Sequence, residues 1–281
     1  MNNVSLSPPT ATSLGIKSSP LEVITALPPL APPRATPLLF VHGAWHGAWC
    51  WAEHFLPYFS NHGFASYAIS LRGHGQSPIN GSVHFARIHD YVADVEEVVA
   101  QLPSAPVLIG HSMGGFIIQK YLERHNAPGA SLLASPPPSG ARRAALRMAQ
   151  RDVRSLVQVS LKMSLYPPID SPEKTRRLLF SADMPDELVE AYFRKLEDDS
   201  YLAYLDMLLF ALPDPRHVKT PLLVLGAADD QNFSTEEIKA TAHAYHAPYE
   251  VFPHMAHDMM LEQGWEAVAT RMVTWLQSRG I

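Results

Sequence analysis

Cysteine is nearly absent from this chain, with Cys50 the single one among 281 residues. One cysteine cannot form an internal disulfide, and its neighbours Trp49 and Trp51 favour a buried thiol over a reactive one. An excess of basic residues is also absent, because the formal net charge is −5 and the lysines and arginines are scattered. We therefore expect neither redox chemistry at this thiol nor nucleic acid as a partner.

Metal-binding motifs are absent as well. The 14 histidines are mostly spread singly, and no HExxH helix or Cys/His cluster occurs. His42 and His46 are four residues apart, but two ligands do not complete a site, and we interpret them as loop histidines that brace a turn. We expect no metal and no cofactor.

A secretory signal and a long apolar run are both absent. Residues 1–36 have neither a basic start nor a continuous apolar stretch, and no run in the chain reaches the length of a membrane span. We expect a protein of the cytoplasm without a membrane span. The sequence leaves its oligomeric state open.

Short apolar runs alternate with amphipathic stretches from Pro37 onward. Continuous apolar strands separated by helices are typical of a mostly parallel sheet covered on both faces, so we expect an α/β fold. The expected strands are Leu38–Val41, Ala65–Leu71, Val107–Gly110, Ser131–Ala134, Leu222–Leu225 and Tyr249–Phe252. The expected helices are Trp49–Phe59, Ile88–Leu102, Gly114–Arg124, Thr235–Tyr245 and Trp265–Gln277.

The chain is expected to form one domain with an insertion. Residues 1–36 are rich in proline and predict an extended arm, with a possible edge strand over Leu21–Leu27. Residues 37–139 and 214–281 carry the alternating pattern of the core. Between them, residues 140–213 show only helical signals, at Arg142–Met163 and Asp186–Phe210, and predict a helical cap over the carboxyl ends of the strands.

One pentapeptide indicates a reaction class. Gly110, His111, Ser112, Met113 and Gly114 follow an apolar run directly and precede a predicted helix. A serine between two glycines at such a strand-to-helix turn can be held in a strained conformation that exposes its hydroxyl. We interpret Ser112 as a nucleophile; the alternative is a helix-capping serine in an unrelated glycine turn.

A serine nucleophile needs a base and a carboxylate that orients the base. Past the later strands, Asp230 and His257 lie in the order expected for a nucleophile-elbow hydrolase. Asp229 is the alternative acid and His254 the alternative base. The strand that ends in His42 and Gly43 predicts an oxyanion hole built from the N–H groups of Ala44 and Met113.

These motifs together resemble the α/β-hydrolase superfamily across roughly Pro37 to the C-terminus. The matching residues are His42–Ala44, Arg72–Ser77, Gly110–Gly115, Asp230 and His257. The segment His42–Trp49 is also similar to the plant methylesterase and hydroxynitrile lyase branch, whereas Arg72–Ser77 looks like the general esterase, lactonase and C–C hydrolase pattern. The resemblance implies an α/β-hydrolase fold and a serine esterase-like activity with Ser112, Asp230 and His257 as its triad.

The leading hypothesis is a serine hydrolase of a small or medium apolar carboxylic ester, lactone or thioester. Its small-molecule substrate would occupy a pocket for which Trp45, Tyr166, Met207 and Phe210 are candidates. The alternatives are a lyase, a C–C bond-cleaving enzyme or a cofactor-independent oxygenase on the same scaffold, and a non-catalytic receptor. Known lyases of this branch carry a basic cap residue, for which Lys162 and Lys195 are candidates.

Overall fold

A single seven-stranded sheet organises the chain in the computed structural model, which describes residues 20–29 and 33–281. The strands are β1 (Val23–Ala26), β2 (Leu38–Val41), β3 (Ser66–Ile69), β4 (Val107–His111), β5 (Ala130–Leu133), β6 (Leu222–Ala227) and β7 (Tyr249–Phe252). Their order is β1-β3-β2-β4-β5-β6-β7, and only β1 is antiparallel to its neighbour. The expected mostly parallel sheet is confirmed.

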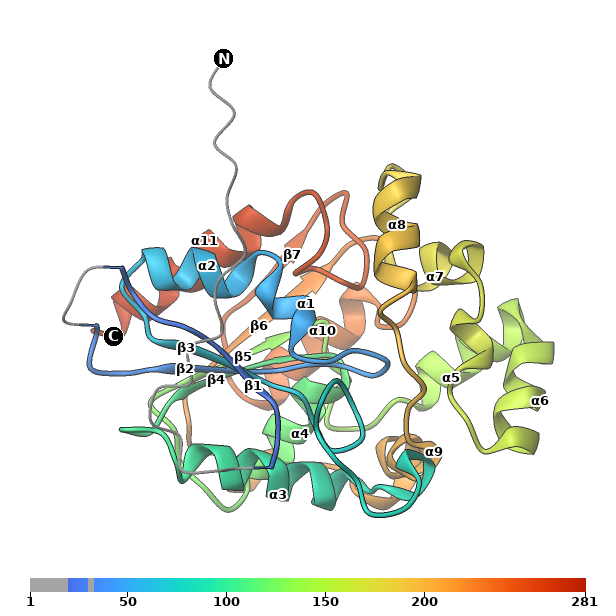
Figure 1. The fold of residues 1–281 in the computed structure, drawn as a ribbon, viewed down its shortest axis with the longest axis horizontal. Helices are drawn as coiled ribbons and strands as arrows, with labels where there is room; N and C mark the ends of the chain where they lie inside the picture. Colours follow the sequence, from blue (N-terminus) through green and yellow to red (C-terminus); the bar gives the residue numbers. More distant parts are fainter. Residues whose placement is uncertain (1–19, 30–32) are drawn as a thin grey trace.

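Helices cover both faces of this sheet. Those of the core are α1 (Trp49–Ala52), α2 (Phe55–Asn61), α3 (Ile88–Val99), α4 (Met113–Leu122), α10 (Thr235–Ala244) and α11 (Trp265–Ser278), with 3₁₀ turns η1 (Val83–Phe85) and η4 (Pro215–His217). Figure 1 shows α2 and α11 on one face and α3 and α4 on the other. Strands β2 to β6 are buried on both faces, which explains their continuous apolar sequences.

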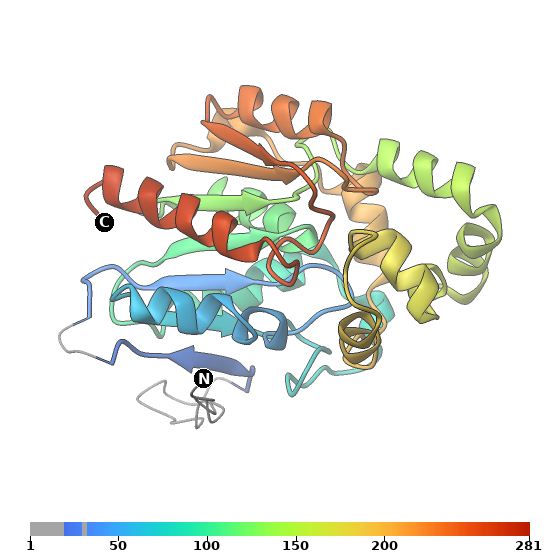
Figure 2. The ribbon, with the colours of Figure 1, turned by 90° about the horizontal axis from the view of Figure 1, so that it is seen from above.

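The segment 140–213 is helical and lies beyond the carboxyl ends of the parallel strands, at the right of Figure 2. We name it the helical insert. It contains α5 (Arg142–Arg151), α6 (Val153–Lys162), η2 (Pro167–Ile169), α7 (Pro172–Leu179), α8 (Asp186–Phe193), α9 (Tyr201–Leu205) and the π-helix η3 (Asp206–Phe210). Within it, the isolated bridge between Ser164 and Ser200 is the one β-type pairing of described residues.

Three expected helices are each divided into two or more pieces. The break between α1 and α2 follows from Pro57, which has no N–H and whose ring would clash with the carbonyl of Glu53 in a continuous helix. The expected helix Arg142–Met163 breaks at Asp152, whose carboxylate accepts the Ser155 N–H at 3.0 Å and so begins α6.

The third divided helix is Asp186–Phe210. Here α8 ends at Phe193 and Ser200 begins α9 by accepting the Ala203 N–H at 3.1 Å. Helix α7 was not predicted, although Ser171 and Pro172 are an N-cap and first-turn signal.

The N-terminal prediction is tested only in part. The edge strand expected within Leu21–Leu27 is present as β1, and it pairs with β3. The rest of the expected proline-rich arm, residues 1–19 and 30–32, lies outside the described residues. In the part of the chain that is described, no helix has both the length and the apolar character needed to cross a bilayer.

The start of α4 packs unusually close to the end of β2. A Cβ on Gly114 would lie 2.3 Å from the Val41 carbonyl oxygen and 2.4 Å from that of His42, and both are rigid backbone atoms. We expect Gly114→Ala to lower the free energy of unfolding by about 3 kcal/mol, the reverse of the usual gain from alanine in a helix. Urea unfolding followed by circular dichroism measures this.

Gly264→Ala is the matched control. Its Cβ would meet only the flexible end of the Met255 side chain at 3.0 Å, and its φ is −87°. We expect a change within about 1 kcal/mol. Equal effects of the two substitutions would contradict the packing argument.

Candidate active site

Ser112 lies at the sharp turn between β4 and α4. Its backbone has φ 49° and ψ −119°, a conformation that costs a non-glycine residue free energy. The surrounding glycines make the turn possible, because a Cβ on Gly110 would lie 2.6 Å from the Gly114 carbonyl group, and one on Gly115 2.5 Å from the Ser135 hydroxyl. The strained turn therefore depends on glycine at these positions.

His257 and Asp230 meet near this turn, from the loops that follow β7 and β6. The His257 Nδ1 lies 2.9 Å from the Asp230 Oδ2, and the two side chains are 2% and 0% exposed. The other Asp230 oxygen accepts the N–H groups of Asn232 and Phe233, at 2.7 and 3.2 Å. The carboxylate is thus fixed toward the imidazole.

The alternative acid and base lie elsewhere. Asp229 is exposed, and the structure gives its carboxylate no contact with His257. His254 is exposed too, in a left-handed conformation with φ 52°. The geometry therefore brings together Asp230 and His257 and leaves out Asp229 and His254.

The charge of Asp230 governs the His257 imidazole. Burial by itself would lower the pKa of His257, but the carboxylate and its hydrogen bond outweigh burial, so the pKa lies above its ordinary 6.5. With Nδ1 donating to Asp230, the Nε2 of the neutral ring is left as a proton acceptor. A base of this kind suits a neutral or slightly alkaline pH.

Ala44 and Met113 supply two N–H groups beside Ser112. Neither N–H donates a hydrogen bond to another described residue. The peptide that carries the Ala44 N–H is fixed from its other end, because the His42 Nδ1 donates to the Gly43 carbonyl at 2.8 Å. The Leu71 N–H donates to the His42 Nε2 at 3.0 Å, which sets the tautomer. His42 therefore braces this turn, as the sequence predicts.

Burial keeps this histidine neutral. Removal from water, reinforced by the positive charge of His74, lowers the pKa of His42 to about 3. The bracing hydrogen bond consequently persists across the pH range in which proteins work.

His46 fixes the next peptide. Its Nδ1 donates to the Ala44 carbonyl at 2.7 Å, and its Nε2 lies 3.1 Å from the Asp258 carboxylate. Burial would raise the pKa of Asp258, but the neighbouring His46 outweighs it and holds the pKa below its ordinary value. A buried carboxylate next to His257 in sequence thus holds the loop after β2.

Trp45 is held by the helical insert at three points. Its N–H donates to the Asp199 carboxylate, its carbonyl accepts the Glu197 N–H, and its indole N–H donates to the Leu165 carbonyl, each at 2.9 Å. Its φ of 69° is costly for a bulky side chain. The insert therefore stabilises the conformation of the residue that follows Ala44.

Asp199 is also the partner of a buried histidine. The His74 Nε2 lies 3.2 Å from its carboxylate, and neither side chain is exposed. Although burial opposes both shifts, the pair raises the pKa of His74 and lowers that of Asp199. Asp199 and Asp258 were not among the predicted site residues. The run Glu197–Asp199 is the one sequence signal near the first, and it does not indicate which residue Asp199 contacts.

Ser112, His257, Ala44 and Met113 border one small cavity, which we name the Ser112 cavity. Its volume is about 70 Å³, and the helical insert forms much of its wall. The other lining residues are Trp45, Pro136, Ala141, Ala144, Ala145, Met148, Val159, Leu165, Pro168, Tyr204, Met207, Asn232 and Phe233. Apart from His257, no described residue that lines it can carry a charge near neutral pH.

The four candidate pocket residues divide into two pairs. Trp45 and Met207 line the Ser112 cavity. Tyr166, directly before η2, packs partly buried against the core, and Phe210, the last residue of η3, is 69% exposed. Neither is among the lining residues of the cavity.

His111, His257 and Asp258 are the described residues whose grouping suggests metal ligation, with ligand atoms within 4.8 Å of one another. Each already has a protein partner. The His111 Nε2 donates to the His257 carbonyl at 2.9 Å, His257 contacts Asp230, and Asp258 contacts His46. Burial lowers the pKa of His111 to about 3. These hydrogen bonds hold the three side chains together, while the His111 Nδ1 and the Asp258 Oδ1 are buried without a hydrogen bond to a described residue.

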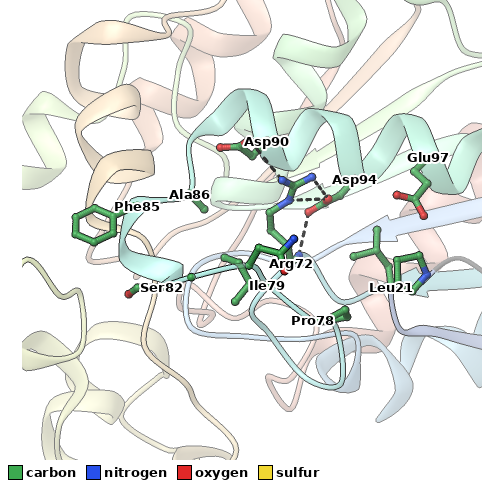
Figure 3. Close-up of a pocket in the computed structure, with 13 residues that line it drawn as sticks. Leu21, Arg72, Pro78, Ile79, Ser82, Phe85, Ala86, Asp90, Asp94 and Glu97 are labelled. Atoms are coloured by element: carbon green, nitrogen blue, oxygen red, sulfur yellow. Dashed lines mark hydrogen bonds and ion pairs between the residues drawn. The ribbon is translucent and has the colours of Figure 1, made fainter.

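A larger hollow, of about 540 Å³, shares no lining residue with the Ser112 cavity (Figure 3). Its wall includes the Arg72 guanidinium, which donates to Asp94 at 2.7 and 2.9 Å and to Asp90 at 3.4 Å. These bonds hold the loop Arg72–Ser77 against α3. The described residues that line this hollow include no histidine, and two of its three carboxylates, Asp90 and Asp94, pair with Arg72.

Comparison with known proteins relates the chain to one family. A family model described as "Alpha/beta hydrolase family" matches residues 38–271. The chain is 37% identical over 79 residues to the pFDCC methylesterase MES16 of Arabidopsis thaliana, a match that spans 27% of this chain and 29% of that relative. It is 26% identical over 204 residues to the phospholipase YtpA of Bacillus subtilis, covering 69% and 75% of the two chains.

Solved structures give the same result for the fold. A thermophilic esterase from Thermogutta terrifontis has a TM-score of 0.69 and 21% sequence identity, over 92% of this chain and 93% of that one. This likeness concerns the fold alone.

Imidazole titration by NMR tests the electrostatics of the site. We expect His257 to stay protonated to a pH above 6.5, and Asp230→Asn to move its midpoint downward, because the charge that favours the imidazolium is lost. His42 and His111 should remain neutral down to a pH of about 3.

Asp229→Asn is the matched control. It should leave the His257 midpoint unchanged, since Asp229 does not contact the ring. A shift in this variant equal to that of Asp230→Asn would contradict the assignment.

Proposed function

Because this chain belongs to the alpha/beta hydrolase family of enzymes, we propose that it is a serine hydrolase that cleaves a small or medium apolar carboxylic ester, lactone or thioester through an acyl-enzyme on Ser112. One observation carries the proposal. His257, which lies 2.9 Å from the buried Asp230 carboxylate, lines the Ser112 cavity together with a serine in a strained turn. The matched relatives support it, since their names describe a methylesterase and a phospholipase.

In the proposed mechanism, the Ser112 oxygen attacks the substrate carbonyl while the His257 Nε2 takes its proton. Asp230 holds the imidazole in the required tautomer and stabilises its protonated form. The negative charge that develops on the carbonyl oxygen is stabilised by the Ala44 and Met113 N–H groups, at about 3 kcal/mol for each donor. His257 then protonates the leaving group, and water releases the acyl group by the same steps.

The proposed substrate class follows from the wall of the cavity. A volume of about 70 Å³ is well below the ~300–1,000 Å³ of pockets for drug-sized ligands, which favours a small acyl or alcohol group. The apolar wall favours an uncharged group. In this proposal the helical insert acts as the cap that shapes the pocket, and residues 37–139 and 214–281 form the catalytic core.

No described lysine favours the lyase alternative. Lys162 is exposed on α6, and the Lys195 ammonium pairs with Glu53 and lies 5.1 Å from the Trp49 ring centre. Neither lines the Ser112 cavity. Cleavage of a cyanohydrin without ester hydrolysis would nevertheless favour a lyase over the hydrolase proposed here.

Ser112→Ala tests the nucleophile. We expect at least a ~10³-fold loss of kcat on p-nitrophenyl acetate, because the remaining groups stabilise charge but cannot form the acyl-enzyme. A fluorophosphonate probe should label Ser112 in the unchanged protein, as read by peptide mass spectrometry. Full activity of Ser112→Ala, or labelling of a different serine, would contradict the proposal.

Asp199→Asn tests the contribution of the helical insert. Loss of its charge weakens the contacts to Trp45 and His74, and we expect kcat to fall about tenfold with little change in KM, because the Ala44 N–H shifts. Asp206→Asn is the matched control. Asp206 is also a buried acid of the helical insert, but it pairs with Arg87 and does not contact Trp45.

Circular dichroism must show that both variants are folded at the assay temperature, since breaking a buried ion pair costs about 3–5 kcal/mol. An equal loss of kcat in the two variants would show that general destabilisation, rather than the Trp45 contact, is the cause.

A further inference from the structure

Apolar side chains face solvent along one side of α6. Val153, Val157 and Leu161 are 59%, 50% and 79% exposed, and their spacing of four residues places them in a line on the helix. Leu146, on α5, is also 59% exposed. Single exposed apolar residues are common, but an aligned set indicates a surface that contacts something apolar.

The opposite sides of these two helices border the Ser112 cavity. Ala144, Ala145 and Met148 of α5 and Val159 of α6 are among its lining residues. The exposed sides therefore point away from the cavity, and Figure 1 shows both helices at one end of the molecule, away from the sheet. The exposed apolar residues are thus not a displaced part of the core.

The same surface is basic in a protein whose formal net charge is −5. Between residues 142 and 162, six residues are basic, namely Arg142, Arg143, Arg147, Arg151, Arg154 and Lys162, and Asp152 is the one acid. Arg147 and Arg151 bond to the core. The other four are exposed and form no ion pair with a described residue. We name the exposed residues Arg142, Arg143, Leu146, Val153, Arg154, Val157, Leu161 and Lys162 the α5–α6 face.

We propose that the α5–α6 face docks on an anionic lipid surface. Helices that lie in a membrane interface combine an apolar stripe with lysine and arginine beside it. The α5–α6 face has both, with Val153, Val157 and Leu161 as its apolar stripe. The charge is complementary to anionic headgroups, and the docked face would lie on the far side of α5 and α6 from the Ser112 cavity.

Vesicle binding by the full chain tests the proposal without measuring turnover. We expect sedimentation with vesicles of phosphatidylcholine and phosphatidylglycerol, weaker sedimentation with phosphatidylcholine alone, and weaker binding as salt is added. Failure of the hydrolase proposal would not alter this result, because no catalytic residue is involved.

Two sets of substitutions separate the apolar and the basic contributions. The triple variant Val153→Ser, Val157→Ser and Leu161→Ser should have an affinity for anionic vesicles that is lower by about tenfold or more. Charge reversal at Arg142, Arg143 and Arg154 to Glu should have at least a similar effect, and it should remove the preference for the anionic lipid.

Matched controls come from exposed residues elsewhere. Leu27→Ser changes an apolar residue that follows β1, at the amino ends of the parallel strands and away from the helical insert, and Lys239→Glu reverses an exposed charge on α10. Both should bind vesicles like the unchanged protein, and circular dichroism should show that all variants are folded. Absence of vesicle binding, or equal binding by all variants, would overturn the proposal. Light scattering that reveals a dimer broken by the serine triple variant would do so too, because the face would then contact a second copy.

Discussion

The candidate site depends on the contact between two backbone segments, the start of α4 and the end of β2. Gly114 approaches the Val41 and His42 carbonyl oxygens so closely that a methyl group could not be placed between them. From the other side, a Cβ on Gly43 would lie 2.9 Å from the Ser112 Cβ. Because β2 and β4 pair in parallel with Val41 beside Gly110, this contact places the Ala44 N–H next to the serine turn. The backbone of the site is therefore positioned by strand register and by the lack of side chains at these glycines, independently of the catalytic groups.

Buried histidines and Asp199 then fix the peptides of the loop after β2, which the backbone contact alone does not hold. The two peptides on either side of Ala44 are each held from the carbonyl end, by His42 and by His46, and the Trp45 N–H is held by Asp199. The neutral His42 and the charged His74–Asp199 pair are consistent with each other, since the positive charge of His74 helps keep His42 neutral. Unpaired, these buried groups would be costly, so the network stabilises one arrangement of the loop against the others.

Much of this arrangement could be predicted from local sequence. The sheet follows from apolar runs, and the serine turn from its glycines, because both are properties of neighbouring residues. Asp230 and His257 could be proposed from their places after β6 and β7, since parallel strands bring their carboxyl ends to one edge. Asp199 and Asp258 could not, because their partners, Trp45 and His46, are 154 and 212 residues away in sequence. The helices of the insert were misjudged for a different reason: Asp152 and Ser200 act as caps only because the chain turns there.

The contacts of Trp45 link the helical insert to the site, and they limit which substitutions in the insert leave the site unchanged. The insert forms much of the wall of the Ser112 cavity, and the same segment supplies all three hydrogen bonds that hold Trp45 in its left-handed conformation. A change that moved Leu165, which contributes both to the wall and to the indole contact, would alter the pocket and the residue after Ala44 together. By contrast, the outward residues of α5 and α6 touch neither Trp45 nor the cavity. Substitutions on the outer surface of the helical insert can therefore leave the site unchanged, whereas substitutions of its inner residues cannot.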